Sequence, residues 1–251
     1  MPAQLAVRYK NRAQQARVVT EAWGRAELFC ANCESASLDG TPPNSRAIDF
    51  VCPRCSASFQ LKAKCGAVGA TMGDGAYTAM LAAIRTDNTP NLLLMRYDWP
   101  AWRVEDLILI PNFAFPESAI IKRKPLAATA RRAGWVGCNI DLRHIAPEAR
   151  ISVVAGREPV PPTAVRASYQ RLKPLREIKA AERGWTLDVL NALRRLGKAE
   201  FATTDAYSFA RDLEQLHPDN RHVRDKIRQQ LQVLRDLGLL VHVERGRWRL
   251  P

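Results

Sequence analysis

Four cysteines of this chain form two evenly spaced pairs. Two residues separate Cys30 from Cys33 and Cys52 from Cys55, and residues 34–51 separate the two pairs. Such short loops let four thiolates converge on one tetrahedral Zn²⁺, and four sulfur ligands leave no open position for a substrate. The pattern therefore predicts a structural zinc site. Four buried, reduced cysteines are the alternative, which the even spacing disfavours.

A second group of candidates lies on the strands that flank the second cysteine pair. Strand signals at residues 46–52 and 57–64 predict a hairpin with the cysteines in its turn. Alternate side chains of a strand share a face, so Gln60 and Lys62 are expected to project together, with Asp49 opposite them.

This pattern of Asp, Gln and Lys has the spacing of a metal-dependent nuclease. The Asp49 carboxylate would be the main ligand of a catalytic Mg²⁺, or of Mn²⁺, and the Gln60 amide oxygen and the Leu61 backbone carbonyl could complete the site. Lys62 would orient the attacking water and stabilise the pentavalent phosphate. A solvated polar strand face is the alternative. The predicted zinc loop favours the catalytic interpretation, because it stiffens both strands.

Composition indicates a nucleic-acid partner. The chain has 251 residues and a formal net charge of +13. Clustered Lys and Arg displace counterions from phosphates, although a basic surface can also serve solubility alone. The sequence contains no apolar run long enough to predict a membrane span, and the N-terminus lacks the apolar core of a signal peptide. We therefore expect a cytoplasmic protein whose cysteines bind metal or stay free rather than form disulfides.

Hydrophobic periodicity predicts an α/β domain around the hairpin. Helices are expected at residues 7–28 and 74–87, and buried strands at 91–97, 104–111 and 150–155. Loops are expected at the Gly-rich residues 65–75 and the basic residues 122–139, and one helix followed by a linker at 156–182.

The C-terminal part has the outline of a winged helix-turn-helix. The predicted helices run from Thr186, as cap, to Leu196, from a cap at Thr203 or Thr204 to about residue 216, and over residues 221–237. Residues 239–243 and 247–250 are expected to form a hairpin with Gly246 in the turn. We therefore predict two domains, residues 1–180 and residues 183–251.

Over nearly its whole length the chain resembles the DpnI-type methyl-directed (type IIM) restriction endonucleases. The resemblance is carried by CANC, IDFVCPRC, FQLKAK, GDGAY, IIKRKPLAATARRAGWVGCNIDL, RGWTLDVLN and HVRDKIRQQLQVLRDLGLL. It implies a PD-(D/E)XK nuclease core with an embedded four-cysteine zinc site, followed by a winged helix. It further implies Mg²⁺-dependent cleavage of double-stranded GATC only when the adenine is N6-methylated, leaving blunt ends, with both domains recognising the site.

The resemblance assigns roles to single residues. Asp49 matches the metal-binding aspartate of the family, Lys62 matches its motif lysine, and Trp135 matches a loop tryptophan implied to contact the methyl groups. A flat indole favours a methyl group over a solvated amino group, whereas a core anchor for the loop is the alternative. Gln60 departs from the family pattern, which has Glu here. The lost charge weakens metal affinity or changes the preferred metal.

The third helix of the winged domain is expected to enter the major groove, where the N6-methyl groups lie. Its candidates for contact with bases or phosphates are Asn220, His222, Arg224, Asp225 and Arg228. Phosphate contacts are expected from Lys226, Arg245 and Arg247, and from Arg131 and Arg132 in the basic loop. Each of these residues could instead be an ordinary solvated side chain. One recognition domain per catalytic domain suggests a monomer.

Two other functions stay open at this point. A catalytically weak or inactive relative would act as a methyl-DNA-binding regulator, and a different nuclease would cut another modified or structured DNA. The set of Asp49, Gln60 and Lys62 favours the endonuclease, because a pure regulator has no need of these residues.

Overall fold

The computed structural model describes residues 1–42, 45, 47–67 and 69–251. The chain forms two compact units whose segments alternate along the sequence. The first contains Met1–Gly69, Thr89–Asn112 and Glu148–Arg171, and the second contains Ala70–Asn88, Phe113–Pro147 and Leu172–Pro251. Both units combine helices with sheet, as the α/β prediction requires. The two-domain division at residues 180 and 183 stays a prediction.

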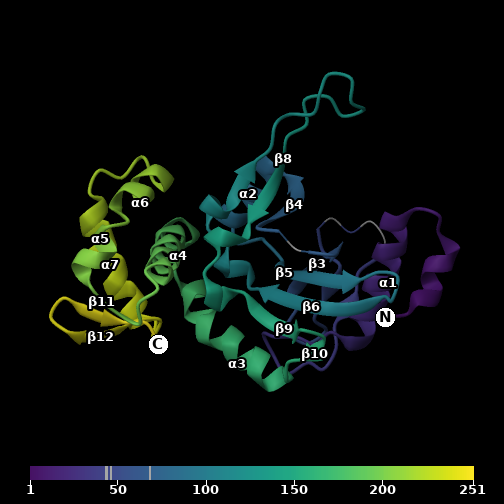
Figure 1. Cartoon of the computed structure of the whole chain (residues 1–251), viewed down its shortest axis with the longest axis horizontal. Helices are drawn as coiled ribbons and strands as arrows, with labels where there is room; N and C mark the ends of the chain where they lie inside the picture. Colours follow the sequence, from purple (N-terminus) through teal and green to yellow (C-terminus); the bar gives the residue numbers. More distant parts are fainter. Residues whose placement is uncertain (43–44, 46, 68) are drawn as a thin grey trace. The chain divides into compact units, whose positions relative to one another are not determined.

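The first unit is built on a mixed sheet (Figure 1). Within the described residues its strand order is β1 (Asp39–Gly40), β2 (Phe50–Val51), β3 (Ser58–Cys65), β5 (Asn91–Asp98), β6 (Arg103–Ile110), β9 (Ile151–Ala155) and β10 (Glu158–Pro159). The pair β3 and β5 is parallel, and the other neighbours are antiparallel. The consecutive apolar residues of β5 are buried, as expected for a central strand covered on both faces.

The helix α1 (Arg12–Glu27) packs on this sheet. Its cap is Asn11, whose Oδ1 accepts hydrogen bonds from the N–H groups of Ala13 and Gln14 at 2.8 and 3.4 Å. Gly24 lies so close to the ring of Phe50 on β2 that a Cβ would overlap it. The prediction of one helix over residues 7–28 was wrong at its start. A separate 3-10 helix, η1 (Ala3–Arg8), precedes the Asn11 cap, and α1 begins only at Arg12.

Two predictions around β2 and β3 are corrected. The strand expected at 46–52 is confined to Phe50–Val51, and its first residue, Arg46, lies outside the described residues. The stretch 65–75 is not all loop, because β4 (Thr71–Ala76) pairs with β8 (Gly137–Asp141); Val68 lies outside the described residues. The two glycines of β4 disfavour a strand locally, but pairing with β8 outweighs that propensity.

In the second unit, β4, β8 and β7 (Ile120–Lys122) form an antiparallel sheet in that order, with α2 (Tyr77–Arg85) next to it. The basic loop expected at 122–139 ends before β8, so residues 123–136 connect the paired strands β7 and β8. Figure 1 shows this connection as a long loop that extends away from the sheet, between the end of β7 and the start of β8.

The winged helix-turn-helix elements also lie in the second unit. They are α4 (Ala180–Arg195), β11 (Glu200–Ala202), α5 (Thr203–Tyr207), α6 (Ala210–Leu216), α7 (Val223–Asp236), β12 (Val241–Glu244) and β13 (Arg247–Arg249). The predicted hairpin is present, and β11 adds a strand to it by pairing with β13. Gly238, with φ of 71°, follows the C-terminus of α7.

Helix boundaries in this region depart from the prediction. The expected linker after α3 (Pro162–Leu172) is instead η6 (Lys173–Glu177) and the first turns of α4. Thr186 is no cap, because it is buried within α4, where its hydroxyl donates to Gln230 Oε1 at 2.7 Å. The helix expected from Thr203 or Thr204 to residue 216 is two helices, and Asp205 caps the first by accepting from the Ala202 N–H at 2.8 Å.

Among the described residues, no helix combines the length and apolar character needed to cross a membrane.

Candidate active site and DNA-binding surface

The four cysteines converge on one point. Their Sγ atoms all lie within 4.8 Å of one another, with 3.6 Å between Cys30 and Cys55 and 3.6 Å between Cys33 and Cys52. Each close pair joins one cysteine of the first loop to one of the second, so the two loops meet at one tetrahedral-sized cluster. The cluster could therefore hold a structural metal ion such as zinc.

The pKa values of the cluster's thiols shift in both directions. Burial raises the pKa of Cys30 and of Cys33. Burial also opposes the ionisation of Cys52, but hydrogen bonds from the backbone N–H groups of Cys55 and Arg54 and from neighbouring cysteine side chains outweigh it and lower the pKa of Cys52 to about 6. The Asn32 side-chain amide donates to Cys55 Sγ at 3.4 Å, and the Ser35 N–H donates to Cys33 Sγ at 3.5 Å. Hydrogen bonds of this kind orient metal ligands and disperse their charge.

The loop of the first cysteine pair is anchored by a helix distant in sequence. Arg166 on α3 donates from Nε to the carbonyls of Cys30 and Cys33 at 3.0 and 2.9 Å, and from Nη2 to the carbonyl of Ser35 at 3.0 Å. Its guanidinium also lies 5.2 Å from the ring centroid of Phe29. Sequence inspection missed Arg166, because carbonyl acceptors leave no mark in a motif.

Asp49 is fixed against β3 by two hydrogen bonds that flank Gln60. Its N–H donates to the Phe59 carbonyl at 2.9 Å, and its Oδ2 accepts from the Leu61 N–H at 2.7 Å. In a strand, the N–H and C=O of one residue point to the same edge. The Leu61 carbonyl therefore points to the edge where Asp49 lies. Lys62, two residues beyond Gln60, is half-buried on the same strand.

Asp49 borders a small polar cavity of about 130 Å³. Its described lining consists of Arg17, Glu21, Arg25, Thr41, Pro42, Ser45, Ile48 and Asp49. Gln60 and Lys62 are not among these described lining residues. The structure thus brings Asp49 to the backbone of the predicted Gln60–Lys62 segment. It also places Asp49 on a cavity shared with α1, a helix that the sequence did not associate with chemistry.

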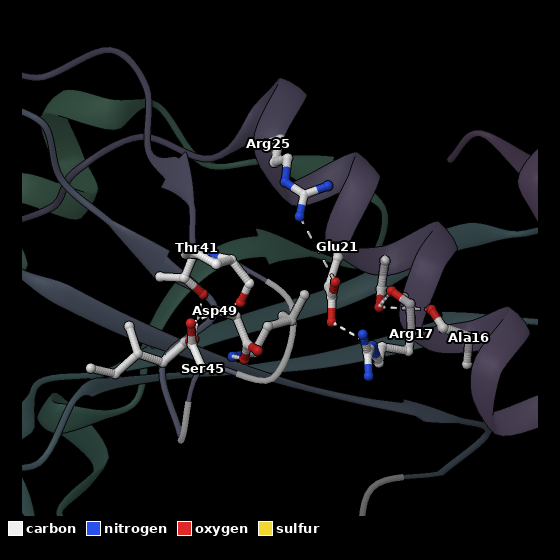
Figure 2. A network of polar contacts seen from close by, with 11 residues as sticks. Ala16, Arg17, Glu21, Arg25, Thr41, Ser45 and Asp49 are labelled. Atoms are coloured by element: carbon white, nitrogen blue, oxygen red, sulfur yellow. Dashed lines mark hydrogen bonds and ion pairs between the residues drawn. The ribbon is translucent and has the colours of Figure 1, made fainter.

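Glu21 is the acidic residue that sequence inspection missed. In Figure 2 it lies between Arg17 and Arg25 on the side of α1 that faces Asp49. Its Oε1 is 3.1 Å from Arg17 Nε, and its Oε2 is 4.0 Å from Arg25 Nη2. Burial raises the pKa of Glu21; the charge of Arg17 opposes this shift and that of Asp49 adds to it. The spacing of four residues between Arg17, Glu21 and Arg25 was the available signal.

These groups fit a hard divalent cation. Magnesium prefers oxygen ligands and is usually held by one or two carboxylates together with water and substrate phosphate. The cavity offers the carboxylates of Asp49 and Glu21, and the Leu61 carbonyl points to the same strand edge. Arg17 and Arg25 line the same cavity and carry charge that suits a phosphate.

The connection between β7 and β8 carries the basic loop residues. Its two ends are hydrogen-bonded to each other: the Arg123 N–H donates to the Gly137 carbonyl at 3.0 Å, and the Leu126 N–H donates to the Trp135 carbonyl at 2.9 Å. Trp135 is half-buried, with Arg132 at 4.7 Å from its ring centroid, and a Cβ at Gly137 would lie 2.8 Å from the indole. Arg131 and Arg132 are exposed.

The N-terminal end of α7 carries the predicted reading residues. Asn220 and His222 precede the helix, and Asn220 Oδ1 accepts from the His222 N–H at 2.8 Å. Both line an open groove with Asp219, Arg221, Asp225, Lys226 and Gln229.

Two arginines of α7 lie against Tyr207 of α5. Arg228 donates to the Tyr207 hydroxyl at 3.1 and 3.0 Å, and the Arg224 guanidinium lies 5.7 Å from the ring centroid. In the wing, Arg245 is exposed and Arg247 lies 3.3 Å from Glu244.

A helix-turn-helix with a basic reading helix and wing is characteristic of DNA-binding proteins. Comparison with known families agrees, since residues 181–250 match the model described as the Dam-replacing HTH domain. Residues 1–178 match the model described as the Dam-replacing family, of DpnI type. The chain belongs to this family, which implies a restriction endonuclease with a DNA-binding helix-turn-helix domain.

Proposed function

We propose that this protein is a methyl-directed restriction endonuclease that hydrolyses double-stranded DNA at GATC sites carrying N6-methyladenine and leaves blunt ends. The observation that carries the proposal is the family match over both parts of the chain, together with the anchoring of Asp49 beside Gln60 on β3. Asp49, Gln60 and Lys62 are its proposed catalytic residues.

The proposed chemistry divides among the hairpin residues. A bound Mg²⁺ would polarise the scissile phosphate and lower the pKa of its bound water. The Asp49 carboxylate, the Gln60 amide oxygen and the Leu61 carbonyl would hold that ion. The Lys62 ammonium would orient the attacking water and stabilise the charge that develops on the phosphate oxygens. The hydrogen bond from Leu61 N–H to Asp49 holds this carboxylate in place before DNA binds.

Recognition is proposed to use both parts of the chain. Asn220, His222, Arg224 and Arg228 would read base edges in the major groove, whereas Lys226, Arg245 and Arg247 would contact phosphates. Trp135 would contact the methyl groups, with Arg131 and Arg132 on the nearby backbone. The groove at the start of α7 supports the role of its loop residues. We further propose that the protein acts as a monomer.

Plasmid DNA from methylating and non-methylating hosts tests this function. The protein is incubated with each plasmid in Mg²⁺ or Mn²⁺, and the products are separated on agarose gels. Cutting of only the methylated plasmid at GATC is expected. Cutting of both plasmids would overturn methyl dependence. Lys62→Ala is expected to abolish cleavage while leaving binding of methylated duplex nearly unchanged, and surviving cleavage would remove Lys62 from the mechanism.

Gln60 favours one alternative function, a methyl-DNA-binding regulator without nuclease activity. An amide in place of a carboxylate removes a negative charge from the proposed metal site. The same plasmids distinguish the two functions: a regulator binds the methylated sites and cuts neither plasmid in either metal.

A further inference from the structure

The side of α1 that borders the Asp49 cavity is charged in an ordered way. Arg17, Glu21 and Arg25 follow one another at intervals of four residues and therefore form one stripe along the helix. All three line the cavity that Asp49 also lines. Figure 2 shows that the Glu21 side chain extends from α1 between the two arginines.

Glu21 is placed differently from an ordinary surface carboxylate. Its side chain is 22% exposed, whereas those of Arg17 and Arg25 are 58% and 51% exposed. Glu21 is thus the least exposed side chain of the three, while both cations reach toward solvent. Two carboxylates that border one small cavity repel each other, and a divalent cation between them removes that repulsion.

Charge decides what such an arrangement can bind. The hairpin set of Asp49, Gln60 and Lys62 contains one carboxylate, because an amide stands at position 60. Magnesium in nucleic-acid enzymes is held through one or two carboxylates and the substrate phosphate. The cavity already contains the second carboxylate, contributed by α1 rather than by the hairpin.

We propose that Glu21 is a ligand of the catalytic metal and supplies the negative charge that Gln60 does not. The proposal rests on the proposed nuclease function. Arg17 and Arg25 hold the carboxylate in the metal-free protein, and their exposed guanidinium groups are then available to the phosphate that arrives with the DNA.

A purely structural role for Glu21 predicts a different behaviour. Ion pairs between residues four apart on an exposed helix contribute little to stability, so Glu21→Gln should then change stability slightly and leave metal affinity as it was. Metal affinity therefore separates the two roles without any measurement of cleavage.

The test titrates Mn²⁺ into the zinc-loaded full-length protein and measures binding by isothermal titration calorimetry. Glu21→Gln and Asp49→Asn are each expected to weaken Mn²⁺ binding by about tenfold or more. Glu27→Gln is the matched control, because it removes an exposed carboxylate at the end of the same helix, and it should bind Mn²⁺ like the wild type. Thermal unfolding of each variant confirms that its fold is intact.

A double variant tests directly whether a carboxylate at position 60 can replace the one at position 21. Adding Gln60→Glu to Glu21→Gln is expected to recover most of the lost Mn²⁺ affinity, whereas a structural role for Glu21 predicts no such rescue. Mn²⁺ affinity that is unchanged in Glu21→Gln but reduced in Asp49→Asn overturns the role of Glu21 and leaves the nuclease proposal standing. Affinity unchanged in both variants overturns Glu21 as a ligand and also removes Asp49 from the proposed metal site.

Discussion

Gln60 and Glu21 illustrate what a single residue can and cannot reveal. Gln60 stands in a motif whose spacing is visible in the sequence, so the missing charge was predictable. Glu21 belongs to no motif, and its proximity to Asp49 arises because Gly24 lets α1 approach the Phe50 ring. The contact at β3 also differs from the expected one. The sequence predicts that the Asp49 side chain faces those of Gln60 and Lys62, whereas Asp49 hydrogen-bonds to the backbone on both sides of Gln60.

Trp135 is the residue proposed to sense the methyl group, and its packing sharpens that prediction. Trp135→Ala should reduce the preference for methylated over unmethylated duplex by about tenfold, because a methyl group in an apolar contact contributes about 1–3 kcal/mol. Non-specific binding should change less. Fluorescence anisotropy with paired duplexes measures both affinities.

The control for this change is Trp135→Phe, which keeps an aromatic ring over Gly137 and beneath Arg132. It should retain most of the preference. An unchanged preference in Trp135→Ala would return the indole to a role as anchor of the loop.

At the scale of elements, α3 and the first cysteine loop act together. Arg166→Met removes three hydrogen bonds to backbone carbonyls and should lower the free energy of unfolding by about 1.5–3 kcal/mol, the usual range for a charged donor. It should also speed the release of bound zinc to a chelating dye. Urea unfolding and dye absorbance measure the two effects.

Arg171→Ala, an exposed position on the same helix, is the matched control and should alter neither quantity. Equal zinc release from both variants would mean that α3 does not secure the cysteine loop.

The turn from β8 into η4 (Leu142–His144) is held by a buried carboxylate. Asp141, 2% exposed, accepts from the Arg143 N–H at 3.0 Å and lies 2.7 Å from Arg143 Nη2. The Arg143 side chain keeps the pKa of Asp141 below its ordinary value of 3.8, although burial opposes this. Because the folded pKa is depressed, the stabilisation is present above pH 3.8 and is lost as pH falls through the folded pKa.

Asp141→Asn should therefore lower the free energy of unfolding by about 1–2 kcal/mol at neutral pH. The difference from wild type should shrink as pH falls below 3.8. Urea unfolding across this range measures it, with Glu214→Gln as an exposed control that should have no effect at either end. A difference independent of pH would show that packing, rather than charge, stabilises the turn.

For the whole molecule, the formal charge of +13 makes DNA affinity dependent on salt. Lys226→Ala should weaken the binding of methylated and unmethylated DNA to similar extents. It should also reduce the slope of log affinity against log salt concentration by about 1, because one phosphate contact is lost. Arg235→Ala, at the other end of α7 and paired with Asp236 at 2.7 Å, should leave the slope unchanged. A selective loss for methylated DNA would move Lys226 from phosphate to base contact.

The sequence by itself determined the cysteine cluster, the buried strands β5 and β6, the α7 helix and the wing, because their signals are local spacing and periodicity. The comparison with known families confirmed the family that these stretches resemble. Tertiary structure decided what depends on residues far apart in the chain. Pairing with β8 made a strand of the Gly-rich β4, packing against Gln230 placed Thr186 inside α4, and close approach of α1 gave Asp49 a cavity shared with Glu21.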